Sequence, residues 1–494
     1  MQIPFGEWLP DQPDHLNPGS TVATNVYHAQ TSYKPVKGLV AYSGASNVTQ
    51  NAKGAGSFRD NTNTVFTFVG TKDNIYKLTS GTFTSVKGSL TISGGDTDYF
   101  TFTQFGNYVI ASNGVNPPMY YLMGTSTNFA TLQSLVTSSG SGTVPAKFKV
   151  SGVIRDFLVT GNIENAKNRV AWSGLNDIST WEAGVSSSDT QDLPGSGGQV
   201  VAITSGEVGY VFRQDQIIRM DFVGGNVVFR FSVISPNRGA VYGQTVCQDN
   251  RQVFFYASDG FFQINGDQVL PIGAEKVNRF FESDLNKAYT DRITSAVDPF
   301  NTLAIWLYPS KDNPNTTGIC DKLLIYNYVT QKWSIAKVKA SQIFKQFVVA
   351  NTVELMDIIS ENLEDINISL DTAYWTTGHL YLGAIDENFK AAIFSGKTLE
   401  AELETKEQEL FPGLRANITN IRPLVDATAN VTIKTRDRLA DNVVTSSSSS
   451  MNNTGLNPVR QSGRYFRANI KIPAESLWTN AQGIDLTASE GGTR

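Results

Sequence analysis

The chain has 494 residues and is weakly acidic, with 40 Lys and Arg residues against 45 Asp and Glu residues and a formal net charge of −5. Proteins that grip nucleic acid through its phosphates are usually basic, so this balance argues against a general nucleic-acid binder. Aromatic residues make up 11% of the sequence, too many for a disordered chain, and the length allows about two to four domains.

Two cysteines, Cys247 and Cys320, are too few for a disulfide scaffold and fit no zinc-binding spacing, so we expect free, buried thiols. The opening residues MQIPFGEWLPDQPDHL lack the basic and apolar regions of a signal peptide. No run approaches the roughly 18 apolar residues of a membrane-spanning helix. We therefore expect synthesis in a cytosol-like compartment and no membrane-spanning segment.

The first part of the chain, residues 1–63, predicts an extended arm that packs on other elements rather than folding alone. Its apolar residues are scattered, and it contains five prolines, which break regular structure: Pro4, Pro10, Pro13, Pro18 and Pro35.

Repeated strand phrases follow from Val65 onwards. The clearest predicts strands at Gln252–Ala257, Phe261–Ile264 and Gln268–Pro271, separated by the turns Ser258–Gly260 and Asn265–Asp267. Such phrases start near residues 65, 106, 157, 207, 252, 303 and 380, at spacings of 41, 51, 50, 45, 51 and 77 residues.

Most of these spacings match the period of a propeller blade, roughly 40–50 residues. The predicted fold is therefore mainly β: an irregular β-propeller of seven or eight blades over residues 64–411. Two stacked β-sandwiches are the rival architecture, because strand phrases alone cannot show that a ring closes.

Helices are expected to be few and short. Apolar residues spaced by three or four predict an inserted helix within residues 351–369 and a second within Gly273–Lys287. The Ser- and Gly-rich stretch Ser138–Thr143 predicts a loop.

After Pro412 the pattern changes to alternating strands, which predict a small, separate β-rich platform-like domain over residues 412–494. Charge is uneven around this boundary: Glu354–Glu409 carries a net −10 and Gly413–Ile472 a net +6. These segments could be two solvated faces, or neighbouring copies of the chain could meet acidic face to basic face.

The sequence offers no convincing catalytic or metal site. The only histidines, His15, His28 and His379, are widely separated, and neither a GxxxxGK[ST] loop nor an HExxH motif occurs. The glycine-rich cluster Pro194–Gly198 precedes a strand rather than a helix, so phosphate binding is not expected. The turn Asn176–Trp181 only approaches the repeated motif of propeller sialidases. We therefore assign no catalytic, cofactor-binding or metal-binding residue and expect no cofactor and no enzymatic activity.

Most of the tryptophans lie in or beside strand phrases, which favours packing between blades over a platform for stacking sugars or bases. They are Trp172, Trp181, Trp306, Trp333, Trp375 and Trp478.

Several segments resemble the tail nozzle proteins of short-tailed bacteriophages (podoviruses), also called tail tubular protein B or packaged-DNA stabilisation proteins. The resemblance is carried by segments from both ends and the middle of the chain: IPFGEWLPDQPDHLNPG at Ile3–Gly19, WSGLNDISTWE at Trp172–Glu182, FYASDGFFQINGDQVLPIGAEKVNRFFESDLN at Phe255–Asn286, LRANITNIRPLVDA at Leu414–Ala427, IKTRDRL at Ile433–Leu439, and GRYFRANIKIPAESLWTNAQGIDL at Gly463–Leu486.

The resemblance implies a structural virion protein of the tail, made in the cytoplasm of a bacterial host. Six copies would form a ring beneath the portal and the adaptor (the head–tail connector) and prolong the channel that retains and ejects phage DNA. Duplex DNA would pass without sequence-specific binding, and tail fibres or spikes would attach nearby. It assigns no catalytic residue and no channel-lining residue.

Two other functions remain open from the residues alone. A receptor- or glycan-binding propeller at a tail tip would need exposed aromatic residues on the propeller face. A propeller glycosidase would need paired carboxylates in the central funnel.

Overall fold

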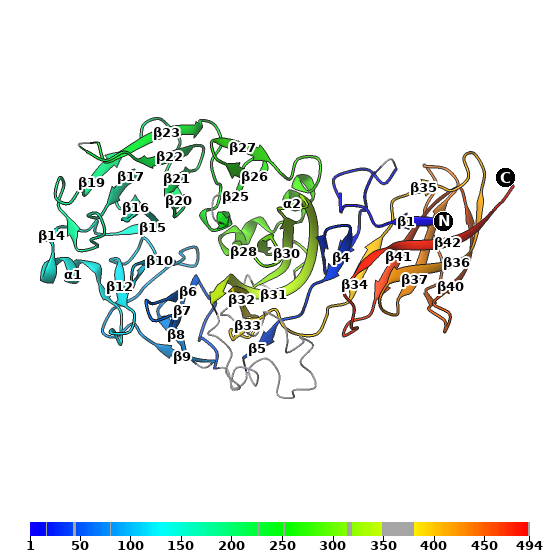
Figure 1. Cartoon of the computed structure of the whole chain (residues 1–494), viewed down its shortest axis with the longest axis horizontal. Coiled ribbons are helices and arrows are strands. Elements are labelled where there is room, and N and C mark those ends of the chain that lie inside the picture. The colour runs from blue at the N-terminus through cyan, green and yellow to red at the C-terminus, as the bar shows by residue number, and fades with distance from the viewer. Residues whose placement is uncertain are drawn as a thin grey trace.

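The structure is a computed structural model and describes residues 1–15, 17–42, 46–79, 81–225, 227–249, 252–313, 319–347 and 380–492. Figure 1 shows a β-propeller joined to a β-sandwich, with both chain termini at the sandwich end. The predicted mainly β propeller fold is confirmed, and the described strands form seven blades of four strands each.

Five blades are independent antiparallel sheets that follow one another along the chain. Their strands, from the innermost outwards, are β6 (Ala55–Arg59), β7 (Val65–Gly70), β8 (Ile75–Thr79) and β9 (Thr82–Ser85); β10 (Thr101–Phe105), β11 (Tyr108–Ser112), β12 (Met119–Leu122) and β13 (Ala130–Thr131); β15 (Phe148–Ile154), β16 (Phe157–Ile163), β17 (Ala166–Trp172) and β19 (Asp189–Asp192); β20 (Val200–Ile203), β21 (Val208–Arg213), β22 (Ile217–Phe222) and β23 (Phe229–Ser235); and β24 (Cys247–Asp249), β25 (Gln252–Ala257), β26 (Gly260–Asn265) and β27 (Gln268–Pro271).

The sixth and seventh blades share one long strand, β31 (Lys332–Phe347). Its first half pairs with β30 and completes the sixth blade, and its second half pairs with β32 and begins the seventh. The sixth blade also contains β28 (Thr294–Asp298), β29 (Leu303–Tyr308) and β30 (Cys320–Asn327), and the seventh contains β32 (Leu380–Asp386), β33 (Ala391–Ile393) and, as its outermost strand, β5 (Val40–Ala41). The N-terminal part of the chain therefore completes the last blade.

Apolar clusters show that the ring is closed. Neighbouring blades are joined by buried hydrophobic clusters all the way round. The last one packs Val69, Tyr76 and Phe83 of the first blade against Phe344 and Ile385 of the seventh. This closure rules out the rival architecture of two stacked sandwiches for this part of the chain.

The predicted phrase starts coincide with the second strand of each blade, because that strand is the most apolar. The predicted three-strand unit at Gln252–Pro271 matches β25, β26 and β27. The innermost strands begin earlier than expected, and β6 starts at Ala55, ahead of the predicted boundary at residue 64.

Helices are short, as predicted. α2 (Asn278–Asp284) and the 3-10 helix η2 (Lys287–Arg292) fall in or next to the predicted segment Gly273–Lys287. The prediction at residues 351–369 lies outside the described residues. α1 (Leu132–Ser139) was not predicted, and it occupies the start of the expected loop Ser138–Thr143. The remaining short elements are β14 (Ser141–Gly142), β18 (Thr180–Trp181) and the 3-10 helix η1 (Gly243–Thr245).

The C-terminal part forms the sandwich, together with strands of the N-terminal arm. One sheet contains β1 (Gln2–Pro4), β3 (Val26–Ala29), β4 (Ser32–Pro35), β42 (Ala481–Glu490), β36 (Ala416–Val425) and β40 (Asn457–Gly463). The other contains β2 (Ala23–Thr24), β34 (Ala401–Glu404), β35 (Gln408–Glu409), β41 (Tyr465–Ile472), β37 (Asn430–Arg436), β38 (Val444–Thr445) and β39 (Ser449–Ser450). The sandwich thus includes residues 401–409, ahead of the predicted boundary at residue 412.

The N-terminal arm joins the two parts. β2 pairs with β31 of the sixth blade on one side and with β34 of the sandwich on the other. Asp11 accepts hydrogen bonds from the first backbone amides of α2, at 2.7 Å from Phe280 and 2.9 Å from Arg279. One buried cluster contains Trp8 of the arm, Trp333 of the propeller and Ile484 of the sandwich, so the C-terminal domain shares its core with the propeller rather than standing apart.

Candidate functional site

The central cavity of the propeller is a candidate site to which every blade contributes. Its volume is about 530 Å³, and the innermost strand of every blade contributes to its wall. Volumes of about 300–1,000 Å³ are usual for small-molecule sites. Residues at this wall come from segments far apart in the sequence, so the sequence alone does not show that they line one cavity.

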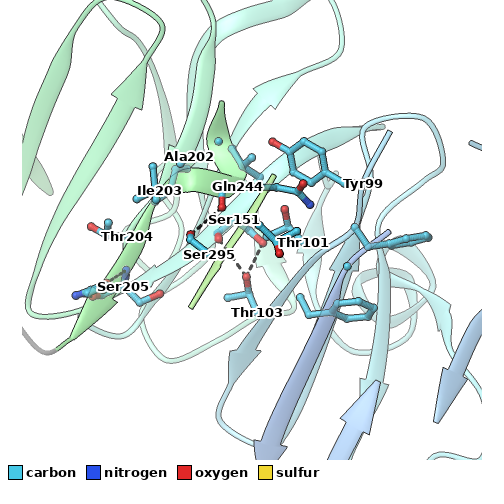
Figure 2. Close-up of a pocket in the computed structure, with 18 of the residues that line it drawn as sticks. Tyr99, Thr101, Thr103, Ser151, Ala202, Ile203, Thr204, Ser205, Gln244 and Ser295 are labelled. Atoms are coloured by element: carbon cyan, nitrogen blue, oxygen red, sulfur yellow. Dashed lines mark hydrogen bonds between the residues drawn. The ribbon is translucent and has the colours of Figure 1, made fainter. Parts of the chain in front are cut away.

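No charged side chain belongs to the described wall of this cavity. Figure 2 shows the polar wall, which consists of hydroxyl and amide side chains: Tyr99, Thr101, Thr103, Ser151, Thr204, Ser205, Gln244 and Ser295 among the labelled residues. Gln104, Gln248, Thr294 and Gln342 also line it. An aromatic wall is formed by Phe58, Phe100 and Phe102, the last two stacked with ring centroids 5.8 Å apart.

Several of these polar groups bond to each other across neighbouring blades. Thr103 Oγ1 lies 2.9 Å from Ser151 Oγ, which joins the second and third blades. Ser295 Oγ donates to the carbonyl of Gln244 at 2.7 Å, and Gln248 Nε2 donates to the carbonyl of Ser205 at 2.7 Å. These bonds hold the inner strands at fixed distances.

Three other polar side chains remain open to the cavity. Within the described residues, no hydrogen bond involves the Tyr99 hydroxyl, the Thr101 hydroxyl or the Gln342 side-chain amide, and Gln342 is only 8% exposed. Burial raises the pKa of Tyr99, so its phenol stays protonated and able to donate.

Charged groups gather beside one end of the cavity, near Tyr99. Lys149 Nζ lies 4.3 Å from the centre of the Tyr99 ring. Lys53 is buried, and its ammonium donates to the carbonyl of Asp96. Burial and the nearby Arg292 lower the pKa of Lys53 to about 8. The charges therefore stand outside the cavity wall rather than in it.

The sandwich carries a second polar cluster, which we call the ion ladder: Glu404, Lys434, Asn469, Arg467, Glu407 and Arg436. Glu404 accepts from Lys434 Nζ at 2.6 Å and from Asn469 Nδ2 at 3.3 Å, and its other oxygen lies 3.3 Å from Arg467 Nε. Glu407 pairs with Arg436. Both carboxylates are almost fully buried, at 1% and 3% side-chain exposure.

The ion ladder accounts for part of the uneven charge. Part of the acidic segment pairs with the basic segment inside one chain, because β34 and β37 flank β41. Glu404 and Glu407 therefore do not form an exposed acidic face. The acidic residues at 354–371 lie outside the described residues.

The histidines do not form a site in the described part of the chain. His28 is buried between Tyr33 and Lys332, with its Nε2 3.1 Å from Lys332 Nζ. Burial and the lysine charge lower the pKa of His28 to about 4, so the ring is neutral and accepts from the ammonium. His15 packs edge-on against Tyr465, and His379 lies outside the described residues.

The glycine cluster Pro194–Gly198 has a structural role in this fold. Its carbonyls at Pro194, Gly195 and Gly198 accept hydrogen bonds from the buried guanidinium of Arg213, at 2.7, 3.1 and 2.8 Å. A phosphate cradle presents backbone N–H groups, whereas this loop turns oxygens towards a cation.

The turn at Asn176–Trp181 is also accounted for by local bonds. Asp177 accepts from the hydroxyls of Ser179 and Thr180, each at 2.6 Å. Burial alone would raise the pKa of Asp177, but these hydrogen bonds lower it. Its carboxylate holds the turn together.

The other predicted residues also have packing roles. Both cysteines are free and buried, as predicted. The packing interpretation is confirmed for Trp172, Trp181, Trp306, Trp333 and Trp478, all of which are buried, and Trp375 lies outside the described residues. Over the described ranges, no cluster of three or more His, Cys, Asp or Glu side chains is suited to a metal, and no helix is long and apolar enough to span a membrane.

Comparison with known proteins leaves the family open. No family model and no curated protein matches the sequence. Distant structural matches include the crystal structure of the mitotic checkpoint complex (9% identity, 76% of this chain and 99% of that chain, TM-score 0.35) and the Neurospora crassa Pan2 WD40 domain (7%, 74% and 96%, 0.38). The extracellular domain of a putative one-component system from B. thetaiotaomicron matches at 10% identity over 83% of this chain and 48% of that chain, with a TM-score of 0.41. At these scores, the assignment of the propeller rests on the order of the strands and the closure of the ring.

Proposed function

We propose that this protein is a structural component of the tail of a short-tailed bacteriophage, a nozzle subunit that helps to retain and eject DNA. The sequence resemblance described above motivates the proposal. The observation that supports it most is the way the N-terminal arm joins the propeller to the sandwich through backbone pairing and one shared core. A subunit of a conduit must transmit force without bending between its parts, and this construction suits that task.

In the proposed assembly, the DNA channel runs between copies of the chain rather than through each propeller. The cavity inside one propeller has the size of a small-molecule site, and bonds such as Thr103–Ser151 tie neighbouring inner strands together around it. A ring of six copies, docked on the adaptor, would enclose the larger bore. We further propose that the protein catalyses no reaction and that tail fibres or spikes attach to the assembled tail.

A conduit must let DNA slide, and the charge pattern is compatible with this. Binding of duplex DNA through phosphates releases counterions and weakens steeply with salt. In the ion ladder, basic residues such as Lys434, Arg436 and Arg467 are paired with acids of the same chain. We expect no submicromolar binding of duplex DNA at physiological salt, which a fluorescence-anisotropy titration at several salt concentrations measures.

The decisive experiment images the purified protein mixed with purified adaptor rings by negative stain. The proposal expects six-fold rings beneath the adaptor, and mass spectrometry of intact virions should find the chain in the tail. A chain that never associates with adaptor rings, or that is missing from virions, contradicts the proposal. A monomer in the absence of adaptor does not, because such rings often form only on a template.

A further inference from the structure

The central cavity differs from the rest of the molecule because it combines an uncharged polar wall with an aromatic wall. We propose that it binds an uncharged, hydroxyl-rich small molecule, of the size of a monosaccharide or disaccharide. This goes beyond the proposed structural function and does not depend on it. A ligand bound in this cavity would contact several blades at once and would make the propeller more rigid.

The neutral lining determines the class of ligand. Burying an ion without a counter-charge costs far more than burying a hydroxyl that finds a hydrogen bond. No charged side chain lines the described wall, and Lys149 stands beside Tyr99 at one end, outside that wall. A phosphate, a carboxylate or a metal ion in the middle of the cavity would therefore contact no counter-charge of the wall. An uncharged ligand avoids this penalty.

The open hydrogen-bonding groups favour a ligand with several hydroxyls. Tyr99 offers a protonated phenol, Thr101 offers a donor and an acceptor, and the Gln342 side chain offers both through one amide. Gln342 is more than nine-tenths buried, and within the described residues its amide has no hydrogen-bond partner. Because this amide faces the cavity, a ligand hydroxyl can reach it, and one such hydrogen bond strengthens binding about fivefold.

The aromatic wall favours a ligand with an apolar face. Phe58 and Phe102 line the cavity and are only partly buried, and Phe102 stacks with Phe100. A sugar ring presents C–H groups on its faces and hydroxyls at its rim. It can therefore lie against the phenyl rings while its rim hydroxyls reach polar groups of the same cavity, such as the Thr101 hydroxyl.

The fixed shape of the cavity supports a pre-formed site. The bonds Thr103–Ser151 and Ser295–Gln244 hold its strands from four different blades or blade connections. Gly243 has no space for a side chain, because a Cβ there would lie 2.1 Å from the carbonyl oxygen of Val201 and 2.7 Å from the Tyr99 hydroxyl. A pre-formed site loses little conformational entropy on binding.

Saturation-transfer NMR on the full-length protein tests the proposal, with glucose, galactose, N-acetylglucosamine and maltose as probes. At least one should show saturation of its ring protons. Gln342→Leu and Thr101→Val should each weaken binding of that sugar about fivefold, the loss of one hydrogen bond. Gln482→Leu, at an exposed position on the sandwich, is the matched control and should leave binding unchanged.

Charge gives an independent readout. Glucose 6-phosphate should bind at least about tenfold more weakly than glucose, because the described wall offers its phosphate no counter-charge and Lys149 lies outside that wall. Thermal unfolding of each variant checks that it is folded before binding is compared. The proposal is overturned if none of the four sugars binds, if the phosphate binds as tightly as glucose, or if folded Gln342→Leu and Thr101→Val variants bind like the unsubstituted protein. None of these results affects the proposed nozzle function, which the adaptor experiment tests separately.

Discussion

The propeller cavity and the ion ladder of the sandwich are both polar surfaces inside the molecule, yet they are built from different residue types. The cavity uses hydroxyls and amides and leaves several of them open. The ladder uses Glu404, Glu407, Arg436 and Arg467, and each charge meets an opposite charge. The difference indicates that the ladder stabilises the sandwich, whereas the cavity wall has hydrogen-bonding groups that a ligand could use.

The same difference should appear in the energetics. Removing one member of a buried ion cluster leaves the others charged and unpaired, which is costly. Removing an open hydroxyl leaves nothing unpaired. A substitution in the ion ladder should therefore lower the free energy of unfolding more than a substitution of an open cavity hydroxyl. The difference should be largest for the most buried ladder residues.

Glu404→Ala should give the largest effect. Its carboxylate is 1% exposed and pairs with Lys434 and with Arg467, which also has Asp14 as a partner at 2.9 Å. Its loss leaves Lys434 without this acid and should lower the free energy of unfolding by about 3 kcal/mol. Urea unfolding followed by circular dichroism measures this. Glu387→Ala, which removes an exposed pair with Lys339 at 3.2 Å, is the control and should cost no more than about 1 kcal/mol. Equal effects of the two substitutions would show that the ladder adds nothing specific.

Arg213→Met should rank second. The buried guanidinium of Arg213 donates to three carbonyls of the loop Pro194–Gly198 and to Gln216 Oε1 at 2.7 Å. Methionine fills much of the volume but leaves these oxygens unpaired, at a cost of about 2–3 kcal/mol. Hydrogen exchange should show faster exchange in β20, which follows this loop. A change confined to other blades would contradict the role assigned to Arg213.

The sequence predicts the propeller better than it predicts the cavity wall or the ion ladder. The propeller was predictable because the second strand of each blade is a short apolar run followed by a turn, as at Gln252–Ala257. The innermost strands are harder to predict because they are short and partly polar, as in Thr101–Phe105. In two blades a polar residue of the inner strand stands five or six residues before the apolar second strand: Thr103 before β11 and Ser151 before β16.

The ion ladder was not predictable in the same way. The acidic and basic segments were visible as composition, but nothing local shows that Glu404 lies opposite Asn469 or that Lys434 lies opposite Arg467. Pairing between strands separated by tens of residues is a property of the fold. The role of the arm in joining propeller to sandwich was hidden for the same reason, because β2 is only two residues long.

His28 should give the molecule a dependence on pH where the arm meets the propeller. Its pKa is lowered from 6.5 to about 4, first by burial and then by Lys332, so the folded state favours the neutral ring. The unfolded chain then binds more protons between these values, and stability present above pH 6.5 is lost as the pH falls towards 4. Urea unfolding from pH 7 to pH 4.5 should show a smaller loss in His28→Gln than in the unsubstituted protein.

A second variant separates the two causes of this shift. Lys332→Met keeps the histidine and removes the neighbouring cation, so the pH dependence should shrink without disappearing. If it disappeared, the lysine charge rather than burial would be the main cause. If both variants kept the full dependence, the acid-sensitive groups would lie elsewhere in the molecule.

The smallest expected effect distinguishes bonded from open hydroxyls within the cavity itself. Thr103→Val removes the bond to Ser151 that joins two blades, at 2.9 Å, and should cost about 1 kcal/mol of unfolding free energy. Thr101→Val, two residues along the same strand, removes a hydroxyl without a hydrogen-bond partner among the described residues and should change stability by less than about 0.5 kcal/mol. Thermal unfolding of the two variants side by side provides the measurement. If Thr101→Val cost as much as Thr103→Val, its hydroxyl would already be engaged in holding the ring, and the cavity would resemble the ladder after all. If only Thr103→Val were costly, the cavity would hold two kinds of polar group: those that fix its walls, and those that stay available to whatever enters.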